Sequence, residues 1–298
     1  MIDTEADWVR RVPRPIRDAA KGSVELFGQL TGPARVLPGL VLIGGQRCGT
    51  SSLHAMLLRH PAVGASFIKE VQYFSLHFDK SERWYRGHFP TKTAAQWSRR
   101  RHGLPLVAAE SSPYYIFHPH APRRLASLLP EARLVVLLRD PVERALSHYG
   151  HERRLGFETL PLEEALSAER RRLAGEVQRM QREPSYRSVA HQHFSYVARG
   201  MYAEQLERWF EFVPRERFLI LSSEELFAEP ERVVARVLTF AGLPQRSLGA
   251  YPRHNRTGGS GREVGDTRRR LRETFAEPNQ RLVELLGHDL PWCCRAAA

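Results

Sequence analysis

Two glycines stand between an apolar run and an amphipathic segment, and this junction constrains the fold more than any other feature. Val41–Ile43 lead into Gly44 and Gly45, and a polar turn then feeds the segment Leu53–Leu57, whose apolar residues recur at helical spacing. A strand, a tight loop and a helix in this order place free backbone N–H groups and the positive end of the helix dipole at the N-terminus of the helix. A phosphate group binds favourably there.

The spacing of the junction is that of a P-loop with one replacement. Gly44 and Gly49 stand as in GxxxxGK[ST], but Thr50 occupies the position of the lysine, and the cation lies inside the loop at Arg47. In a P-loop that lysine reaches the β- and γ-phosphates of a nucleoside triphosphate. The sequence therefore predicts a loop that holds a phosphate without the usual lysine.

The charge balance does not by itself indicate a nucleic-acid-binding protein. The 298 residues carry a formal net charge of +12, which suits nucleic acid, an acidic membrane surface or an anionic substrate. The arginines are interleaved with glutamates, as in 163–172 and 204–217, which is typical of solvated helix faces. No zinc-finger, RNP or homeodomain pattern is present, so we expect no nucleic-acid partner.

Cysteine usage argues against disulfides and metals. The odd set Cys48, Cys293 and Cys294 lacks the paired spacing of a disulfide framework or a zinc site. We therefore expect no metal and a reducing compartment. The apolar run 36–43 contains a proline and is too short to cross a bilayer, and residues 1–30 do not read as a secretory signal. The sequence thus predicts a cytoplasmic protein without a transmembrane segment.

Apolar strands alternate with helical segments along the chain. This order predicts an α/β fold, a P-loop-like three-layer sandwich in which helices flank both faces of a central parallel sheet. Residues 1–36 read as an N-terminal helical extension and 37–298 as the main domain, and 161–182 reads as one highly charged helix. The expected strands are 40–44, 62–67, 106–110, 133–138 and 218–221.

Chemistry-bearing residues follow several of these strands. Arg139 ends the 133–138 strand and Ser147 lies about two helical turns further on, so a guanidinium and a hydroxyl are placed to bind one anion. Glu70 follows the 62–67 strand, and the segment 253–262 is rich in arginine and glycine. Because ligands lie beyond the carboxyl ends of parallel strands, we expect these residues and the loop after residue 44 to share one cleft.

Together these motifs resemble the sulfotransferases that use 3′-phosphoadenosine 5′-phosphosulfate (PAPS). The resemblance is to the branch that includes the heparan sulfate N- and 3-O-sulfotransferases and many bacterial relatives. It implies the sulfotransferase fold and a sulfotransferase domain over 37–298. The matching segments, in order along the chain, are 45–53, 69–74, 84–90, 110–114, 139–149, 200–202 and 258–262.

The resemblance also implies a reaction and a role for each matching residue. The enzyme would move a sulfuryl group from PAPS to a hydroxyl or amine by in-line displacement and release adenosine 3′,5′-bisphosphate. Glu70 would deprotonate the acceptor, and Arg47 and Lys69 would supply positive charge. Arg139 and Ser147 would bind the 3′-phosphate. The 5′-phosphosulfate would lie on Gly45, Gln46, Arg47, Cys48, Gly49, Thr50, Ser51 and Ser52, and the residues closing on the nucleotide would be Gly259, Ser260, Gly261 and Arg262.

Departures from the family pattern leave alternatives open. Arg47 stands at the position where the heparan enzymes carry a lysine, and Gln72 stands at the position where some of them carry a histidine. The acceptor therefore need not be that of the heparan enzymes, and we expect a glycan, a lipid or a small hydroxylated metabolite.

A P-loop kinase or NTPase is an alternative reading, and it would use ATP and magnesium, with Asp140 as the metal-binding acid. Thr50 and Arg139 argue against that reading. A third possibility is a non-catalytic nucleotide-binding relative. The sequence is silent on oligomeric state.

Overall fold

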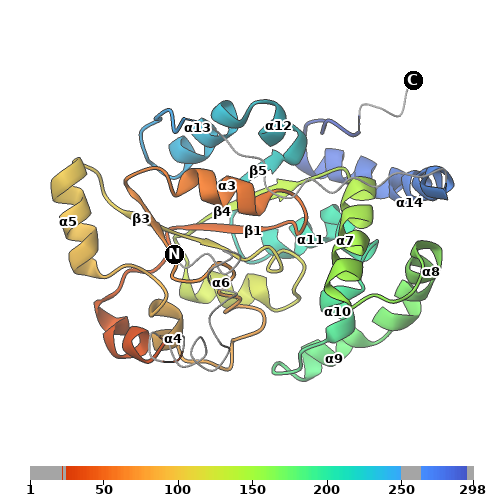
Figure 1. Ribbon diagram of the computed structural model, residues 1–298, viewed down its shortest axis with the longest axis horizontal. Coiled ribbons are helices and arrows are strands. Elements are labelled where there is room, and N and C mark those ends of the chain that lie inside the picture. The colour runs from red at the N-terminus through yellow and green to blue at the C-terminus, as the bar shows by residue number, and fades with distance from the viewer. Residues whose placement is uncertain (1–21, 23–24, 250–262, 294–298) are drawn as a thin grey trace.

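Five parallel strands form one sheet in the order β2-β3-β1-β4-β5 (Figure 1). This is a computed structural model, and it describes residues 22, 25–249 and 263–293. Every expected strand is present, with ends that shift by a few residues at most. The strands are β1 (Leu40–Gly44), β2 (Val63–Ala65), β3 (Val107–Ser111), β4 (Arg133–Leu138) and β5 (Phe218–Ser222).

The central strand β1 is buried along its whole length. Side chains alternate across a sheet, so Val41 and Ile43 join a core on one face, while Leu40 and Leu42 join a second core on the other. Helices cover both cores, which confirms the predicted three-layer α/β sandwich. On the first face lie α4 (Glu82–Arg86), α6 (Ala121–Leu128) and α11 (Tyr202–Phe210), and on the second α3 (Thr50–Leu57), α12 (Ser223–Ala228) and α13 (Pro230–Phe240).

The remaining helices extend beyond the two ends of the sheet. Figure 1 shows α5 (Lys92–His102) at one end and α7 (Pro141–Leu155) with α14 (Glu263–Leu286) at the other. A third apolar cluster joins Val142 and Ala145 of α7 to Leu271 and Phe275 of α14. This packing fixes the direction in which α7 leaves the end of β4, and therefore where its first two turns lie.

The strand order creates a topological switch point at β1. The chain passes from β1 to β2, returns through β3 beside β1, and then adds β4 on the opposite side of β1. Loops that leave the carboxyl ends of β1, β3 and β4 consequently diverge around one crevice. Ligands of open α/β sheets bind at such a crevice.

One predicted helix was wrong. The segment 161–182 forms two helices, α8 (Leu162–Leu173) and α9 (Glu176–Arg182), because Gly175 adopts a left-handed conformation with φ of 76°. Glycine takes that conformation without the steric cost that a side chain imposes. The short helix α10 (Val189–His193) was not expected from the sequence.

The N-terminal extension is described only in part. Residues 25–31 are helical and lead into a 3-10 turn, η1 (Gly32–Ala34). This segment packs tightly against the end of α4. A Cβ at Gly28 would lie only 2.9 Å from the carbonyl oxygen of Gly87, the residue that follows α4. Arg35 donates from Nη1 to the carbonyl of Phe89 at 2.6 Å. The division into 1–36 and 37–298 stays a prediction.

A buried carboxylate fastens the turn after α7 to α8. The Oε2 of Glu158 accepts hydrogen bonds from Nη1 of Arg172 at 2.5 Å and from the hydroxyl of Tyr196 at 2.8 Å. Its Oε1 accepts the backbone N–H groups of Thr159 and Leu160, both at 2.9 Å. Burial disfavours the charge, but these donors outweigh burial and lower the pKa of Glu158 to about 2.

The variant Glu158→Gln tests this fastening through its pH dependence. Because the folded-state pKa lies below the ordinary value of 4.5, the carboxylate stabilises the fold above that value, and the stabilisation is lost as pH falls toward the folded-state pKa. We expect urea unfolding to show a loss of about 3 kcal/mol at pH 7 that shrinks to less than half by about pH 3. The exposed neighbour Glu164→Gln is the matched control. A penalty independent of pH would contradict the account.

Candidate active site

The loop after β1 turns sharply into α3. Gly49 is the residue before the helix, and its φ of 90° lies in the left-handed region. The helix starts at Thr50, and its first backbone bond of the α-helical type runs from Leu53 N–H to the Gly49 carbonyl at 3.0 Å. The N–H groups of the first turn of a helix have no intrahelical acceptor. Together with the helix dipole they suit an anion, as the sequence predicted.

The loop is anchored from behind by buried groups. Cys48 is fully buried, and burial raises the pKa of its thiol to about 11, so it fills space rather than reacting. Ser223 donates its hydroxyl to the carbonyls of Cys48 at 2.5 Å and Leu138 at 2.9 Å. Arg199 donates to the side-chain oxygen of Gln46. These bonds tie the loop to β4, to α12 and to η2 (Ala198–Gly200).

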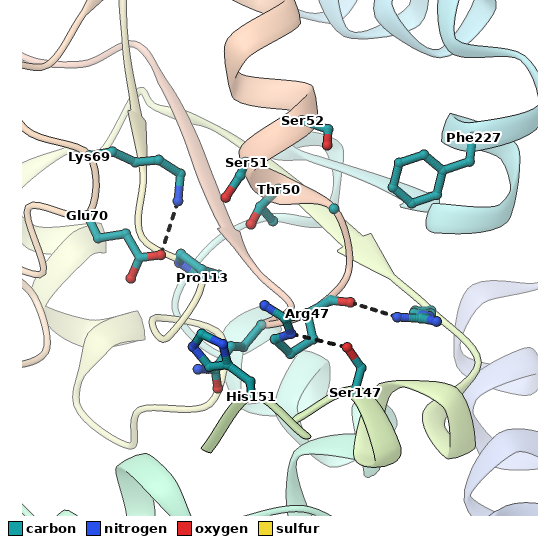
Figure 2. A pocket seen from close by; sticks show the side chains of 13 residues that line it. Arg47, Thr50, Ser51, Ser52, Lys69, Glu70, Pro113, Ser147, His151 and Phe227 are labelled. Carbon is teal, nitrogen blue, oxygen red and sulfur yellow. Dashed lines mark hydrogen bonds and ion pairs between the residues drawn. The ribbon is translucent and has the colours of Figure 1, made fainter. Parts of the chain in front are cut away.

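The predicted anion-binding residues of two strands meet at this loop (Figure 2). Arg139, at the end of β4, donates from Nη1 to the carbonyl of Arg47 at 3.3 Å. Arg47 in turn donates from Nε to the hydroxyl of Ser147 on α7 at 3.2 Å. Burial, and then the nearby cations Arg154 and Arg139, lower the pKa of Arg47. Excess positive charge is therefore held in a partly desolvated place, where an anion binds most strongly.

Glu70 lies on the other side of the same cavity, facing Lys69 in Figure 2. Lys69 Nζ is 3.1 Å from Oε1 of Glu70, and Gln72 donates from Nε2 to Oε2 at 2.7 Å. Ser75 donates its hydroxyl to Oε1 of Gln72 at 2.6 Å, which fixes the orientation of that amide. Both oxygens of Glu70 are thus held, and the carboxylate is positioned before any ligand arrives.

Left-handed backbone is concentrated at this site. Among the described residues other than glycine, a positive φ occurs at Arg47 (68°), Glu70 (59°) and Gln72 (57°). A non-glycine residue in this region carries a conformational cost that the surrounding structure must offset, and such residues cluster at functional sites. Here they are the two candidate catalytic side chains and the residue that holds one of them.

A buried hydrogen-bond network supports the Glu70 segment from below. Glu110 on β3 is fully buried, and its carboxylate accepts hydroxyl groups from Tyr85 at 2.5 Å, Tyr115 at 2.6 Å and Ser112 at 2.9 Å. The hydroxyl of Ser112 accepts the backbone N–H of Gln72 at 3.1 Å. Tyr85 is therefore a core residue rather than a wall of the cleft. The network connects β3 to the strained turn that carries Glu70.

The loop after β1, the Arg139–Ser147 pair and the Lys69–Glu70 pair line one cavity of about 300 Å³. Gly45 and Cys48 are not among its lining residues, and Gly259, Ser260, Gly261 and Arg262 lie outside the described residues. Sequence reasoning missed His151 and Phe227, although the spacing of His151, one helical turn after Ser147, was a usable signal. The lining residues are Gln46, Arg47, Gly49, Thr50, Ser51, Ser52, Lys69, Glu70, Pro113, Arg139, Ser147, His151 and Phe227.

Two residues at the start of α7 have structural tasks. Asp140 accepts the backbone N–H of Val142 at 2.9 Å and so caps α7, and it does not line the cavity. Arg144 is fully buried and donates to the carbonyl of Tyr196. Within the described part of the chain, no group of three or more His, Cys, Asp or Glu side chains is gathered to hold a metal ion. Asp140, the acid that a kinase reading would need, is thus engaged as the cap of α7.

Comparison with known proteins agrees with the fold. The sulfotransferase domain family model matches residues 37–254. The chain is therefore an enzyme of the sulfuryl-transferring class, and it belongs to the sulfotransferase domain family. A kinase reading is not favoured.

Individual relatives fall in the branch that the motifs resemble. The chain is 27% identical to mouse heparan sulfate glucosamine 3-O-sulfotransferase 6, covering 88% of this chain and 76% of the relative. It is 28% identical to the bovine bifunctional heparan sulfate N-deacetylase/N-sulfotransferase 2, covering 70% of this chain and 22% of that protein. The solved sulfotransferase from Alicyclobacillus acidocaldarius is 26% identical, with a TM-score of 0.63 over 87% of this chain and all of that one.

Over residues 22, 25–249 and 263–293, no helix combines the length and the apolar character needed to cross a membrane.

The variant Gly49→Ala tests the tight turn at the head of α3. A Cβ there would require a left-handed alanine and would lie 3.0 Å from Cζ of Phe227. We expect urea unfolding to show a loss of about 1–2 kcal/mol. Gly150→Ala in α7 is the matched control, because nothing lies within 4 Å of its Cβ position and alanine favours a helix by up to about 1 kcal/mol. Stabilisation by both substitutions would contradict the turn geometry.

Proposed function

We propose that this protein transfers a sulfuryl group from PAPS to a hydroxyl or amine of an acceptor, with Glu70 as the base. One observation carries the proposal. The loop after β1, the Arg139–Ser147 pair and Glu70 line a single cavity, and Arg47 is hydrogen-bonded to both members of that pair. Two anion sites at neighbouring strand ends suit a nucleotide with phosphates at two positions.

The donor set fits PAPS. Backbone N–H groups at Gly49–Ser52 and the Arg47 guanidinium suit the 5′-phosphosulfate, with Gln46 also lining the cavity and Gly45 and Cys48 shaping the loop. Arg139 and Ser147 combine a guanidinium with a hydroxyl and suit the 3′-phosphate. On the resemblance alone, the proposal extends to Gly259, Ser260, Gly261 and Arg262 as residues that close on the nucleotide. PAPS is the usual donor in this family.

The side chains supply what sulfuryl transfer needs. Glu70 accepts the proton of the acceptor hydroxyl while the acceptor oxygen bonds to sulfur and the bridging S–O bond breaks, releasing adenosine 3′,5′-bisphosphate. A positioned base of this kind contributes about 10²–10⁴-fold in rate. Arg47 and Lys69 offset the negative charge that grows on the bridging oxygen, and one well-placed donor is worth about 10²–10³-fold. An arginine keeps its charge in this role even when partly buried.

The acceptor is proposed by class only. The named relatives act on heparan sulfate, which favours a carbohydrate, and a lipid or a small hydroxylated metabolite is the second choice. Gln72, which holds Glu70 at 2.7 Å, lies beside the point where the acceptor must arrive and so contributes to its selection. We keep the cytoplasm as the proposed compartment, on the cysteine content of the sequence.

The variant Glu70→Gln separates the base from nucleotide binding. It keeps the size of the side chain and removes the proton acceptor. We expect transfer from PAPS to fall by about 10²–10⁴-fold, while calorimetry shows adenosine 3′,5′-bisphosphate bound with unchanged affinity. Turnover is scored as adenosine 3′,5′-bisphosphate released with a panel of glycans, lipids and hydroxylated metabolites.

The exposed Glu164→Gln serves as the control and should behave as wild type in both assays. Full turnover in Glu70→Gln would remove the base from the proposal. A wild-type protein that binds the nucleotide but turns over with no acceptor in the panel would instead favour a non-catalytic relative.

A further inference from the structure

A histidine that the sequence analysis did not consider lines the cavity. His151 is on α7, one helical turn beyond Ser147, and it lines the cavity together with Arg47 and Glu70. Figure 2 shows its ring beside the Arg47 side chain, on the side that faces Glu70. His151 therefore shares the cavity with the residues proposed to hold the sulfuryl group and with the residue proposed to receive the acceptor proton.

A neighbouring arginine determines the tautomer of this histidine. Nδ1 of His151 is 3.0 Å from Nη2 of Arg154. A guanidinium can only donate hydrogen bonds, so Nδ1 must accept. In the neutral ring the proton is then on Nε2, which becomes a hydrogen-bond donor.

The surroundings favour the neutral ring. Burial, and then the positive charge of Arg47, lower the pKa of His151, with Arg154 acting in the same direction. Glu152 and Glu70 act in the opposite direction. Glu152 is already engaged by two other histidines, with His148 Nε2 at 3.3 Å and His193 Nδ1 at 2.9 Å. At neutral pH the ring therefore offers an uncharged N–H.

The polarity of the cavity indicates which ligand group this N–H meets. Glu70 is the one carboxylate among the described lining residues, and an acceptor hydroxyl needs it as a proton acceptor. A sulfuryl group has only oxygen lone pairs and therefore needs donors. Building on the proposed function, we propose that Nε2–H of His151 donates a hydrogen bond to a sulfuryl oxygen of PAPS, beside Arg47. His151 then distinguishes PAPS from adenosine 3′,5′-bisphosphate, which lacks that group.

The test compares the two nucleotides by calorimetry without an acceptor. His151→Ala should bind PAPS about 10- to 100-fold more weakly, as expected for a hydrogen bond to a charged group, and bind adenosine 3′,5′-bisphosphate within about twofold of wild type. His151→Gln places an amide N–H near the position of Nε2 and should restore most of the PAPS affinity. His151→Asn places it near Nδ1 and should behave like alanine. His102→Ala, at the exposed end of α5, is the matched control.

Equal losses for both nucleotides in His151→Ala, or no loss for either, would overturn the assignment. A glutamine variant no better than alanine would also overturn it. Thermal melting shows whether each variant is folded. If His151→Ala does not fold, the assignment is decided by comparing the PAPS affinities of His151→Gln and His151→Asn. A wild-type protein that binds neither nucleotide would instead remove the proposed function on which the assignment rests.

Discussion

The hydrogen bond from Arg139 to the carbonyl of Arg47 joins the end of β4 to the loop after β1, and the geometry of the site depends on it. Two cations are thereby held close together in a partly desolvated place, where burial, and then the charges of Arg154 and Arg139, lower the pKa of Arg47. Such an arrangement is unfavourable in isolation and becomes favourable when an anion enters. The parallel sheet makes it attainable, because the carboxyl ends of adjacent strands lie at one edge.

The other half of the site rests on a buried carboxylate in the core. Glu110 accepts hydrogen bonds from three hydroxyl groups in the core. The hydroxyl of one of these donors, Ser112, also accepts the backbone N–H of Gln72. This chain of bonds holds a turn with left-handed residues and thus places Glu70 opposite Arg47. The proposed base, Glu70, and the proposed charge-stabilising group, Arg47, follow different strands, and the segment that carries each is fixed by buried contacts.

Most of the fold and much of the candidate site could be predicted from the sequence. Apolar runs with clear ends gave all five strands, and the rule for strand carboxyl ends gave the common location of Arg47, Glu70 and Arg139. It did not show that helix 161–182 breaks at Gly175, because an isolated glycine is tolerated in many helices. Nor did it show the left-handed turn at Glu70, which depends on Ser112 and Glu110 from another strand. Phe227 reaches the cavity only through tertiary packing, and residues 259–262 lie outside the described chain.

A crystal structure of the complex with adenosine 3′,5′-bisphosphate tests the central claim most directly. The account predicts the 5′-phosphate within hydrogen-bond distance of the backbone N–H groups at Gly49–Ser52, and the 3′-phosphate on Arg139 and Ser147. It also predicts Glu70 facing the point where the sulfuryl group would extend. A nucleotide bound in the reverse orientation, or outside the cavity between β1 and β4, would contradict the account.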